Sequence, residues 1–192
     1  LAKQVPHLHH KVQLTNEFQQ DVQWWLAFLP SYNGVSFFYH DSWQSDAELH
    51  IFTDSSDQAA AGYFGGSWFV VPFTGPFAPL RDMSINWREL FAVVTAAATF
   101  GSHWRSKRIM MHCDNMCIVQ VLTSGTSKSE TLMNLVRKLF FISATFNFEL
   151  SACYVNTKEN TVADALSRLQ FTKFVAEAPD RPLCMQVPVM VL

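Results

Sequence analysis

The chain has 192 residues, of which 49% are hydrophobic and 16% are charged, and its formal net charge is −2. This composition indicates a globular protein and excludes an intrinsically disordered chain. No apolar run reaches the ~18 residues that a membrane-spanning helix requires, and the first residues lack the pattern of a secretory signal, so we expect no membrane partner. Because the sequence does not begin with methionine, we interpret it as part of a longer protein.

The four cysteines form neither a CxxC pair nor a zinc-binding spacing. Two of them, Cys113 and Cys153, lie within apolar runs. Buried, reduced thiols are typical of proteins in a reducing compartment. The cysteines therefore predict an intracellular protein, either cytoplasmic or nuclear.

An amphipathic helix is predicted over residues 16–29, where apolar side chains recur at helical spacing. Asn16 is the expected N-terminal cap, and Pro30 is expected to end the helix. Trp24 and Trp25 suit a face that packs either on another domain or on the same domain, and the sequence leaves both interpretations open.

Strands and helices then follow in an order that is typical of an α/β protein. Three strands come first, joined in part by a tight Gly65-Gly66 turn that suits an antiparallel hairpin. Further elements are expected in the order helix, strand, helix, helix, strand, helix. The sequence predicts an α/β fold with a five-stranded mixed sheet, three antiparallel strands first, flanked by helices. The predicted strands cover 49–54, 58–64, 67–73, 107–114 and 147–155, and the predicted helices 86–100, 115–122, 129–143 and 160–169.

Four acidic residues come from four separate elements of this pattern. Asp54 and Asp114 lie at the ends of two strands that are expected in the middle of the sheet. Glu89 and Asp164 lie in the first turns of two helices, each beside apolar residues. We expect the four side chains to converge on one point.

Converging carboxylates repel one another and are costly to bury, so a fold keeps such a cluster only where cations neutralise it. Hard oxygen ligands suit Mg²⁺, with Mn²⁺ as an alternative. Two such ions ~4 Å apart form the arrangement used for in-line displacement at phosphorus. The cluster therefore predicts a two-metal site for phosphodiester hydrolysis.

Each acid also has a structural interpretation. Asp54 suits the start of a turn, and Asp114 suits a helix cap. Glu89 and Asp164 suit the positive end of a helix dipole, and Asp164 also fits a capping box with Thr161. The structural interpretation must hold four times over in the right topological order, which favours the metal site.

Four segments resemble the ribonuclease H domains of retrotransposon reverse transcriptases, with catalytic motifs like those of Ty3/gypsy elements. Residues 158–169 (KENTVADALSRL) resemble the last helix of these domains, and ADALSR is a highly specific motif. Residues 52–56 (FTDSS) resemble the first strand of these domains, and residues 87–90 (WREL) resemble the helix with the catalytic Glu. Residues 112–115 (HCDN) resemble the strand end that carries the third acid.

The resemblance implies an endonuclease that hydrolyses the RNA strand of RNA–DNA hybrids and leaves 5′-phosphate and 3′-hydroxyl ends. In its terms Asp54 bridges two Mg²⁺ ions, Asp164 completes the site of the ion that holds the attacking water, and Glu89 and Asp114 hold the other ion.

The same resemblance implies three residues that contact the substrate. Asn115 is expected at the minor groove, where a 2′-hydroxyl distinguishes RNA from DNA. Gly62 is expected to give the hybrid close access to the backbone opposite Asp54. Ser55 is the third expected contact.

The resemblance also suggests a domain organisation. Residues 1–46 are similar to the segment that joins the polymerase to ribonuclease H in DIRS-like elements, the tyrosine-recombinase retrotransposons. Residues 47–170 would be the ribonuclease H domain, and the proline-containing residues 171–192 an outgoing linker. The expected partners are the RNA–DNA hybrid and the upstream polymerase domain.

Two departures from the family and the net charge leave other functions open. Residues 156–160 lack the histidine that many ribonucleases H carry, and the loop over 123–128 has only Lys128 where many cellular members have a basic protrusion. Both departures agree with a net charge that is low for a nucleic-acid binder acting alone. The alternatives are a catalytically silent interaction or connection module and a different nuclease on the same fold.

Overall fold

The computed structural model describes residues 11, 13–31, 44–45, 51–180 and 182–190. The chain divides into two compact units, Leu1–Val35 and Ser36–Leu192. The boundary predicted after residue 46, and the first two residues of the strand predicted over 49–54, lie outside the described residues. Among the helices in the described part of the chain, none has the length and apolar character needed to cross a membrane.

The smaller unit contains helix α1 (Asn16–Phe28), which continues into a 3₁₀ turn over Leu29–Ser31. Thr15, and not the predicted Asn16, caps the helix, because Thr15 Oγ1 accepts a hydrogen bond from the Phe18 backbone N–H at 3.3 Å. The Trp24 ring stacks on Phe28 one turn later, with centroids 5.2 Å apart.

The first sheet of the larger unit is an antiparallel meander. It is formed by β2 (Phe52–Ser55), β3 (Ala59–Phe64) and β4 (Ser67–Pro72). Gly65 and Gly66 have φ values of 52° and 80°, the left-handed conformation that the predicted tight hairpin requires. A short strand, β7 (Cys184–Met185), adds a parallel partner to β4.

The second sheet is parallel and consists of β1 (Gln44–Ser45), β5 (Arg108–Cys113) and β6 (Glu149–Tyr154). The prediction of one five-stranded sheet was therefore wrong, because no ladder joins β2 to β5 among the described residues.

A side chain takes part in the break between the two sheets. The Thr53 carbonyl accepts a hydrogen bond at 3.0 Å from Nδ2 of Asn160, the residue that precedes α6, so a side chain occupies this backbone acceptor. Across the seam, Thr53 Oγ1 lies 3.6 Å from Met111 Sδ. β2 and β5 thus meet through side chains.

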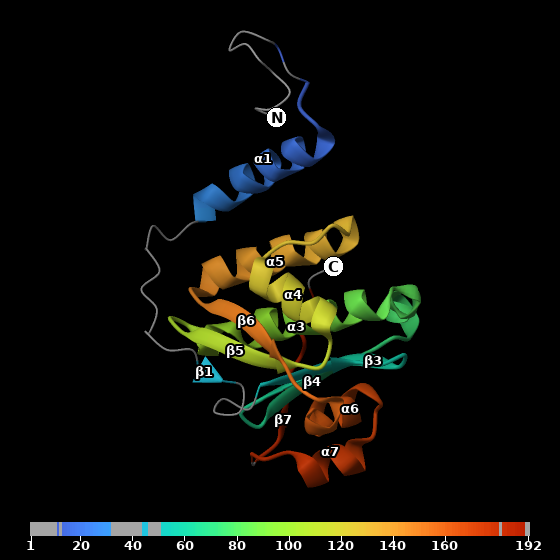
Figure 1. The fold of residues 1–192 in the computed structure, drawn as a ribbon. Coiled ribbons are helices and arrows are strands. Elements are labelled where there is room, and N and C mark those ends of the chain that lie inside the picture. The colour runs from blue at the N-terminus through green and yellow to red at the C-terminus, as the bar shows by residue number, and fades with distance from the viewer. Residues whose placement is uncertain (1–10, 12, 32–43, 46–50, 181, 191–192) are drawn as a thin grey trace. The chain divides into compact units, whose positions relative to one another are not determined.

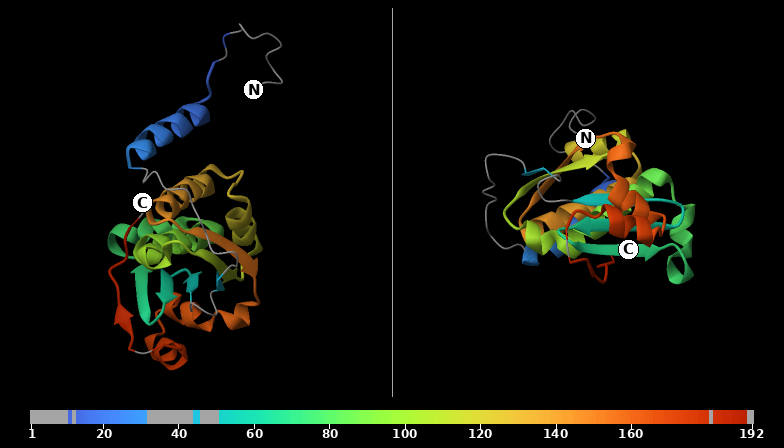
Figure 2. Two further views of the ribbon diagram at one scale, coloured as in Figure 1. Left: turned by 90° about the vertical axis from the view of Figure 1, so that its left-hand side faces the viewer. Right: turned by 90° about the horizontal axis from the view of Figure 1, so that it is seen from below.

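The helices are arranged in two layers about the sheets, as Figures 1 and 2 show. α3, α4 and α5 cover one face, and α6 and α7 cover the other face of the meander. The bounds are α3 (Ile85–Phe100), α4 (Met116–Ser124), α5 (Glu130–Phe146), α6 (Thr161–Ser167) and α7 (Phe171–Glu177), with 3₁₀ helices at Gly75–Asp82, Gly101–Trp104 and Thr157–Glu159.

Two apolar clusters hold these layers together. The larger lies between the sheets and α3, α4 and α5, and draws on strands from both sheets. Alternation along β3 serves both clusters, since Ala60 faces the larger cluster while Ala61 and Tyr63 face the smaller one beneath α6 and α7. Both sheets therefore pack on the same helices, which fixes the position of β2 relative to β5.

Residues 171–192 were predicted to be an outgoing linker, and the described residues among them, 171–180 and 182–190, include a helix and a short strand that pack on the rest of the larger unit. Phe174 of α7 is 1% exposed and belongs to the smaller cluster, and β7 extends the meander. The prolines at 179, 182 and 188 flank these short elements and do not form a continuous linker.

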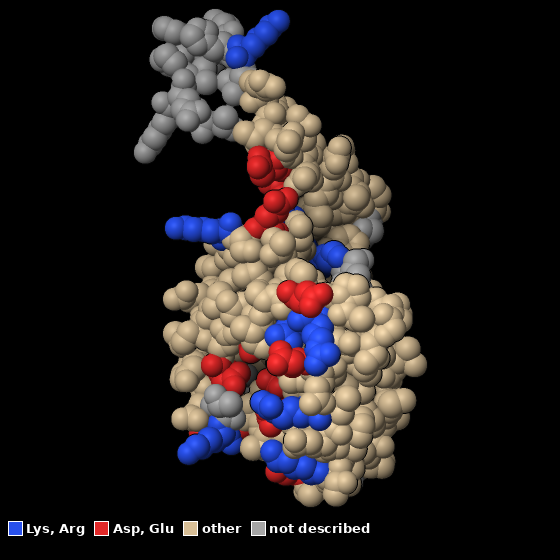
Figure 3. All heavy atoms as spheres, turned by 90° about the vertical axis from the view of Figure 1, so that its right-hand side faces the viewer, with Lys and Arg blue, Asp and Glu red and all other residues tan. Residues whose placement is uncertain are grey.

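The surface charge of the larger unit is mixed. On the face drawn in Figure 3, acidic and basic side chains are interspersed, and no continuous basic band is visible there. This distribution agrees with the net charge of −2.

Candidate metal centre

Asp54 is held at the end of β2 by a fastened turn. Ser56 Oγ donates a hydrogen bond to the Ser167 carbonyl of α6 at 2.7 Å. From the other side, Arg88 of α3 donates through Nη1 to the Ser56 carbonyl at 2.7 Å and to Asp57 Oδ1 at 2.8 Å. These contacts tie the turn after β2 to one helix from each layer.

The Asp54 carboxylate lies in a partly buried and electrostatically crowded position. Burial, and to a smaller extent the negative charges of Asp114 and Asp164, raise the pKa of this carboxyl to about 6. A short hydrogen bond from Ser167 Oγ to Asp54 Oδ2, 2.5 Å long, acts in the opposite direction. Asp54 is therefore close enough to Asp114 and Asp164 for their negative charges to raise its pKa.

Glu89 of α3 and Asp114 at the end of β5 come together with a residue that the sequence reasoning did not include. Ligand atoms of Glu89, Cys113 and Asp114 all lie within 4.8 Å of one another. Burial raises the pKa of Glu89 to about 7, with further contributions from Asp114 and Asp54. Burial likewise raises the pKa of the Cys113 thiol to about 12, so this thiol is protonated at neutral pH.

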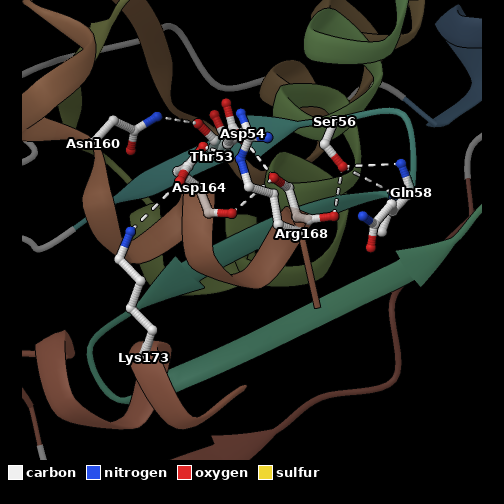
Figure 4. A network of polar contacts seen from close by, with 10 residues as sticks. Thr53, Asp54, Ser56, Gln58, Asn160, Asp164, Arg168 and Lys173 are labelled. Carbon is white, nitrogen blue, oxygen red and sulfur yellow. Dashed lines mark hydrogen bonds and ion pairs between the residues drawn. The ribbon is translucent and has the colours of Figure 1, made fainter. Parts of the chain in front are cut away.

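Asp164 lies on α6 and faces two cations (Figure 4). Arg168 Nε lies 2.6 Å from Asp164 Oδ1, and Lys173 Nζ of α7 lies 3.7 Å from Asp164 Oδ2. The carboxylate is engaged in these ion pairs and is not part of a capping box with Thr161. The N-terminal cap of α6 is Asn160, which makes no side-chain capping bond.

Two of the three predicted substrate contacts are committed to the fold. The Ser55 side chain is 5% exposed, and its hydroxyl donates to the Ala59 carbonyl at 3.4 Å. Gly62 pairs with Thr53 and not with Asp54. A Cβ at Gly62 would lie 2.4 Å from Phe69 Cε1, so close packing by Phe69 accounts for this glycine.

Asn115 caps α4 beside the acid cluster. Its Oδ1 accepts hydrogen bonds from the backbone N–H groups of Cys117 at 2.9 Å and Ile118 at 3.4 Å. Its Nδ2 donates to Asn86 Oδ1 at 2.8 Å. A further side-chain hydrogen bond to Glu89 lowers the pKa of that acid. Asn115 therefore helps to position Glu89 through this hydrogen bond, in addition to the substrate contact predicted for it.

Three residues that position the site had no role in the sequence reasoning. Ser167 binds Asp54, Asn160 binds the backbone of β2, and Arg88 binds the turn after β2. All three lie within the motifs already quoted, WREL and KENTVADALSRL. The motifs marked these residues, but only the packing of α3 and α6 against β2 reveals their function.

Part of the chain is similar to a known family. Residues 84–170 match the family described as reverse transcriptase-like. This reverse transcriptase-like stretch begins at the cap of α3, ends just after α6 and contains Glu89, Asp114 and Asp164. The match supports a ribonuclease H-like fold for the stretch and indicates no particular retroelement. A comparison with curated proteins finds none that matches the chain.

Proposed function

We propose that this chain is a divalent-metal-dependent ribonuclease H domain of a retroelement reverse transcriptase. It hydrolyses the RNA strand of RNA–DNA hybrids and leaves 5′-phosphate and 3′-hydroxyl ends. The observation that supports this proposal is the electrostatic coupling of Asp54 in β2 to three other acids: Glu89 of α3, Asp114 after β5 and Asp164 of α6.

The donor set fits divalent cations. The cluster offers hard carboxylate oxygens, and burial together with mutual repulsion raises the pKa of Asp54 to about 6 and that of Glu89 to about 7. Positive charge at the cluster relieves both effects. When bound, two Mg²⁺ or Mn²⁺ ions activate a water molecule and stabilise the departing oxygen.

The four acids have separate roles in this proposal. Asp54, which is coupled to the other three acids, would take part in holding both metal ions. Glu89 and Asp114 would hold one ion, with the Cys113 thiol beside them. Asp164, which forms ion pairs with Arg168 and Lys173, would help to hold the other.

Substrate binding depends on other parts of the longer protein as well. The mixed surface charge and the net charge of −2 supply little phosphate affinity. An upstream polymerase domain, as in the retrotransposon enzymes that the motifs resemble, supplies the remainder. Asn115, which is half-buried, stays in the proposal as a minor-groove contact, whereas Ser55 and Gly62, which are buried, do not.

A catalytically silent module is the alternative function. The salt bridges that occupy Asp164 favour it, because an acid neutralised by two basic side chains does not need a metal. The raised pKa values of Asp54 and Glu89 favour catalysis, because this uncompensated repulsion has no structural benefit.

Cleavage of a labelled RNA–DNA hybrid in Mg²⁺, Mn²⁺ or EDTA tests the proposal. We expect metal-dependent cutting of the RNA strand alone, reduced at least about a hundredfold in Asp54→Asn and Asp114→Asn because each variant removes a metal ligand. Asp82→Asn, at an exposed position in the 3₁₀ helix Gly75–Asp82, is the matched control and keeps full activity.

The outcomes separate the two functions. Most of the activity surviving in Asp54→Asn would contradict the site. Absence of cutting by the unaltered chain with every metal, both alone and joined to its polymerase, would favour the silent module.

A further inference from the structure

Both carboxylate oxygens of Asp164 face a basic side chain. Arg168, the residue directly after α6, is the closer of the two, with its Nε 2.6 Å from Asp164 Oδ1. Lys173 approaches from α7, and its 3.7 Å separation from Oδ2 is too long for a hydrogen bond. Lys173 therefore lies beside Asp164 without donating a hydrogen bond to it.

The position of Lys173 is fixed by the packing of α7. The next residue, Phe174, is 1% exposed, and its ring lies 5.3 Å from the Trp68 ring and 6.0 Å from the Tyr63 ring. The Phe174 N–H also donates to the Gln170 carbonyl at 3.0 Å. This anchoring carries Lys173 to the edge of the site, and Figure 4 shows its side chain extending from α7 towards Asp164.

The ammonium of Lys173 retains donors for another anion. An ammonium has three N–H donors, and within the described part of the chain no hydrogen bond from Lys173 is found. Its side chain is 44% exposed. Arg88, by contrast, is buried and bound to Ser56 and Asp57, so it has no comparable access to a ligand.

We propose that Lys173 binds a backbone phosphate of the cut strand next to the acid cluster and exchanges its ion pair with Asp164 for that phosphate. The inference rests on the proposed function, which places a phosphodiester at the cluster. A lysine on a flexible four-carbon stem can reach a phosphate that arrives beside Asp164. Acidic and basic side chains are interspersed on the face in Figure 3, and we expect this single lysine to supply a measurable share of the affinity for phosphate.

A phosphate contact has a definite signature. Loss of the contact weakens binding to all sequences equally. Its loss also reduces the slope of log Kd against log salt by about one. The contact carries no base information, so RNA–DNA hybrid and duplex DNA are affected alike.

Equilibrium binding of a fluorescently labelled hybrid to the full 192-residue chain measures this signature. The titrations are made in Ca²⁺ at several salt concentrations, with uncut RNA verified on a gel. We expect Lys173→Met to raise Kd about five- to tenfold and to reduce the slope of log Kd against log salt by about 0.7 to 0.9. Lys173→Arg keeps the charge and keeps Kd within about threefold.

Lys107→Met is the matched control. Lys107 immediately precedes β5, at the opposite end of the strand from Asp114, and we expect its loss to leave Kd within about twofold. Equal weakening by Lys107→Met and Lys173→Met would overturn the proposal, because it would indicate general charge and not a local contact.

Two further results distinguish this proposal from the proposed function. If the unaltered chain binds hybrid and Lys173→Met lowers only the melting temperature, with Kd and slope unchanged, Lys173 is a structural ion-pair partner and the phosphate assignment fails alone. If the unaltered chain neither binds nor cuts hybrid, both alone and joined to its polymerase, the proposed function and the lysine assignment fail together.

Discussion

Ser167 of α6 donates a hydrogen bond to Asp54 of β2, with Oγ and Oδ2 2.5 Å apart. The two residues are separated by 113 positions in the sequence. Ser167 is fully buried, and its carbonyl also accepts the hydrogen bond from Ser56. This one residue thus fixes both the carboxylate of Asp54 and the turn behind it.

Replacing Ser167 with alanine is expected to shift the acid limb of the cleavage pH profile upwards. The Ser167 hydrogen bond lowers the pKa of Asp54, so its loss moves that pKa above its present value of about 6. A shift of about one pH unit lowers activity about fivefold at pH 6 and little at pH 8. Ser143→Ala, whose hydroxyl bonds only within α5, is the control. Equal loss of activity at both pH values would indicate a structural defect instead.

In EDTA, the chain is expected to lose stability as the pH rises from about 4 to about 7. Asp54 and Glu89 have folded-state pKa values near 6 and 7, above their ordinary values of 3.8 and 4.5. At a pH below the ordinary pKa values, both carboxyls are protonated in the folded and in the unfolded chain. At a pH between the ordinary and the folded-state pKa values, the folded chain binds more protons than the unfolded chain, so the free energy of unfolding falls as the pH rises until both carboxyls are ionised. We expect the melting temperature to fall by on the order of 5 °C over this window.

The double variant Asp54→Asn, Glu89→Gln is the reference for this measurement, since it removes both titrations. Millimolar Mg²⁺ at pH 7.5 is expected to restore the melting temperature of the unaltered chain and not that of the variant. A melting temperature that follows the same pH curve in both proteins would contradict a strained acid cluster.

Much of the fold followed from local sequence signals, whereas the site's supporting contacts did not. β3, β4, α3 and α5 have strong periodicity and turn signals, and each appears within a few residues of its predicted range. The four acids were singled out because each lies at or near the end of a predicted element, within one of the motifs quoted above. The contacts of Ser167 and Lys173 depend on how α6 and α7 pack against β2, which no local pattern encodes.

The same reasoning explains the features that the sequence analysis did not anticipate. α7 has seven residues and no side-chain capping bond, and β7 has two residues, so neither offers a local signal. The single sheet was expected because strand order alone suggests it, but the Thr53 carbonyl is bound by Asn160. Tertiary contacts decided each of these features.

Gly62→Ala is expected to destabilise the chain by about 1 to 3 kcal/mol through overpacking. The new Cβ would lie 2.4 Å from Phe69 Cε1 and 2.8 Å from Cζ, in a fully buried position. Combining it with Phe69→Leu is expected to recover part of the loss, seen as favourable coupling in a double-mutant cycle from chemical denaturation. If the double variant is stable but fails to bind hybrid, the close-access role first predicted for Gly62 is restored.

Phe174→Ala is expected to cost about 3 to 5 kcal/mol, because it leaves a cavity among Tyr63, Trp68 and α6. Val175→Ala, on the same helix with a side chain that is 48% exposed, is expected to cost less than about 1 kcal/mol. Urea denaturation of both variants measures the difference.

A chain ending at residue 170 is expected to be destabilised at least as much as Phe174→Ala, since it loses this anchor together with β7. Unchanged stability of the shortened chain would instead mean that the segment after α6 is a linker, and the placement of Lys173 beside Asp164 would lose its support.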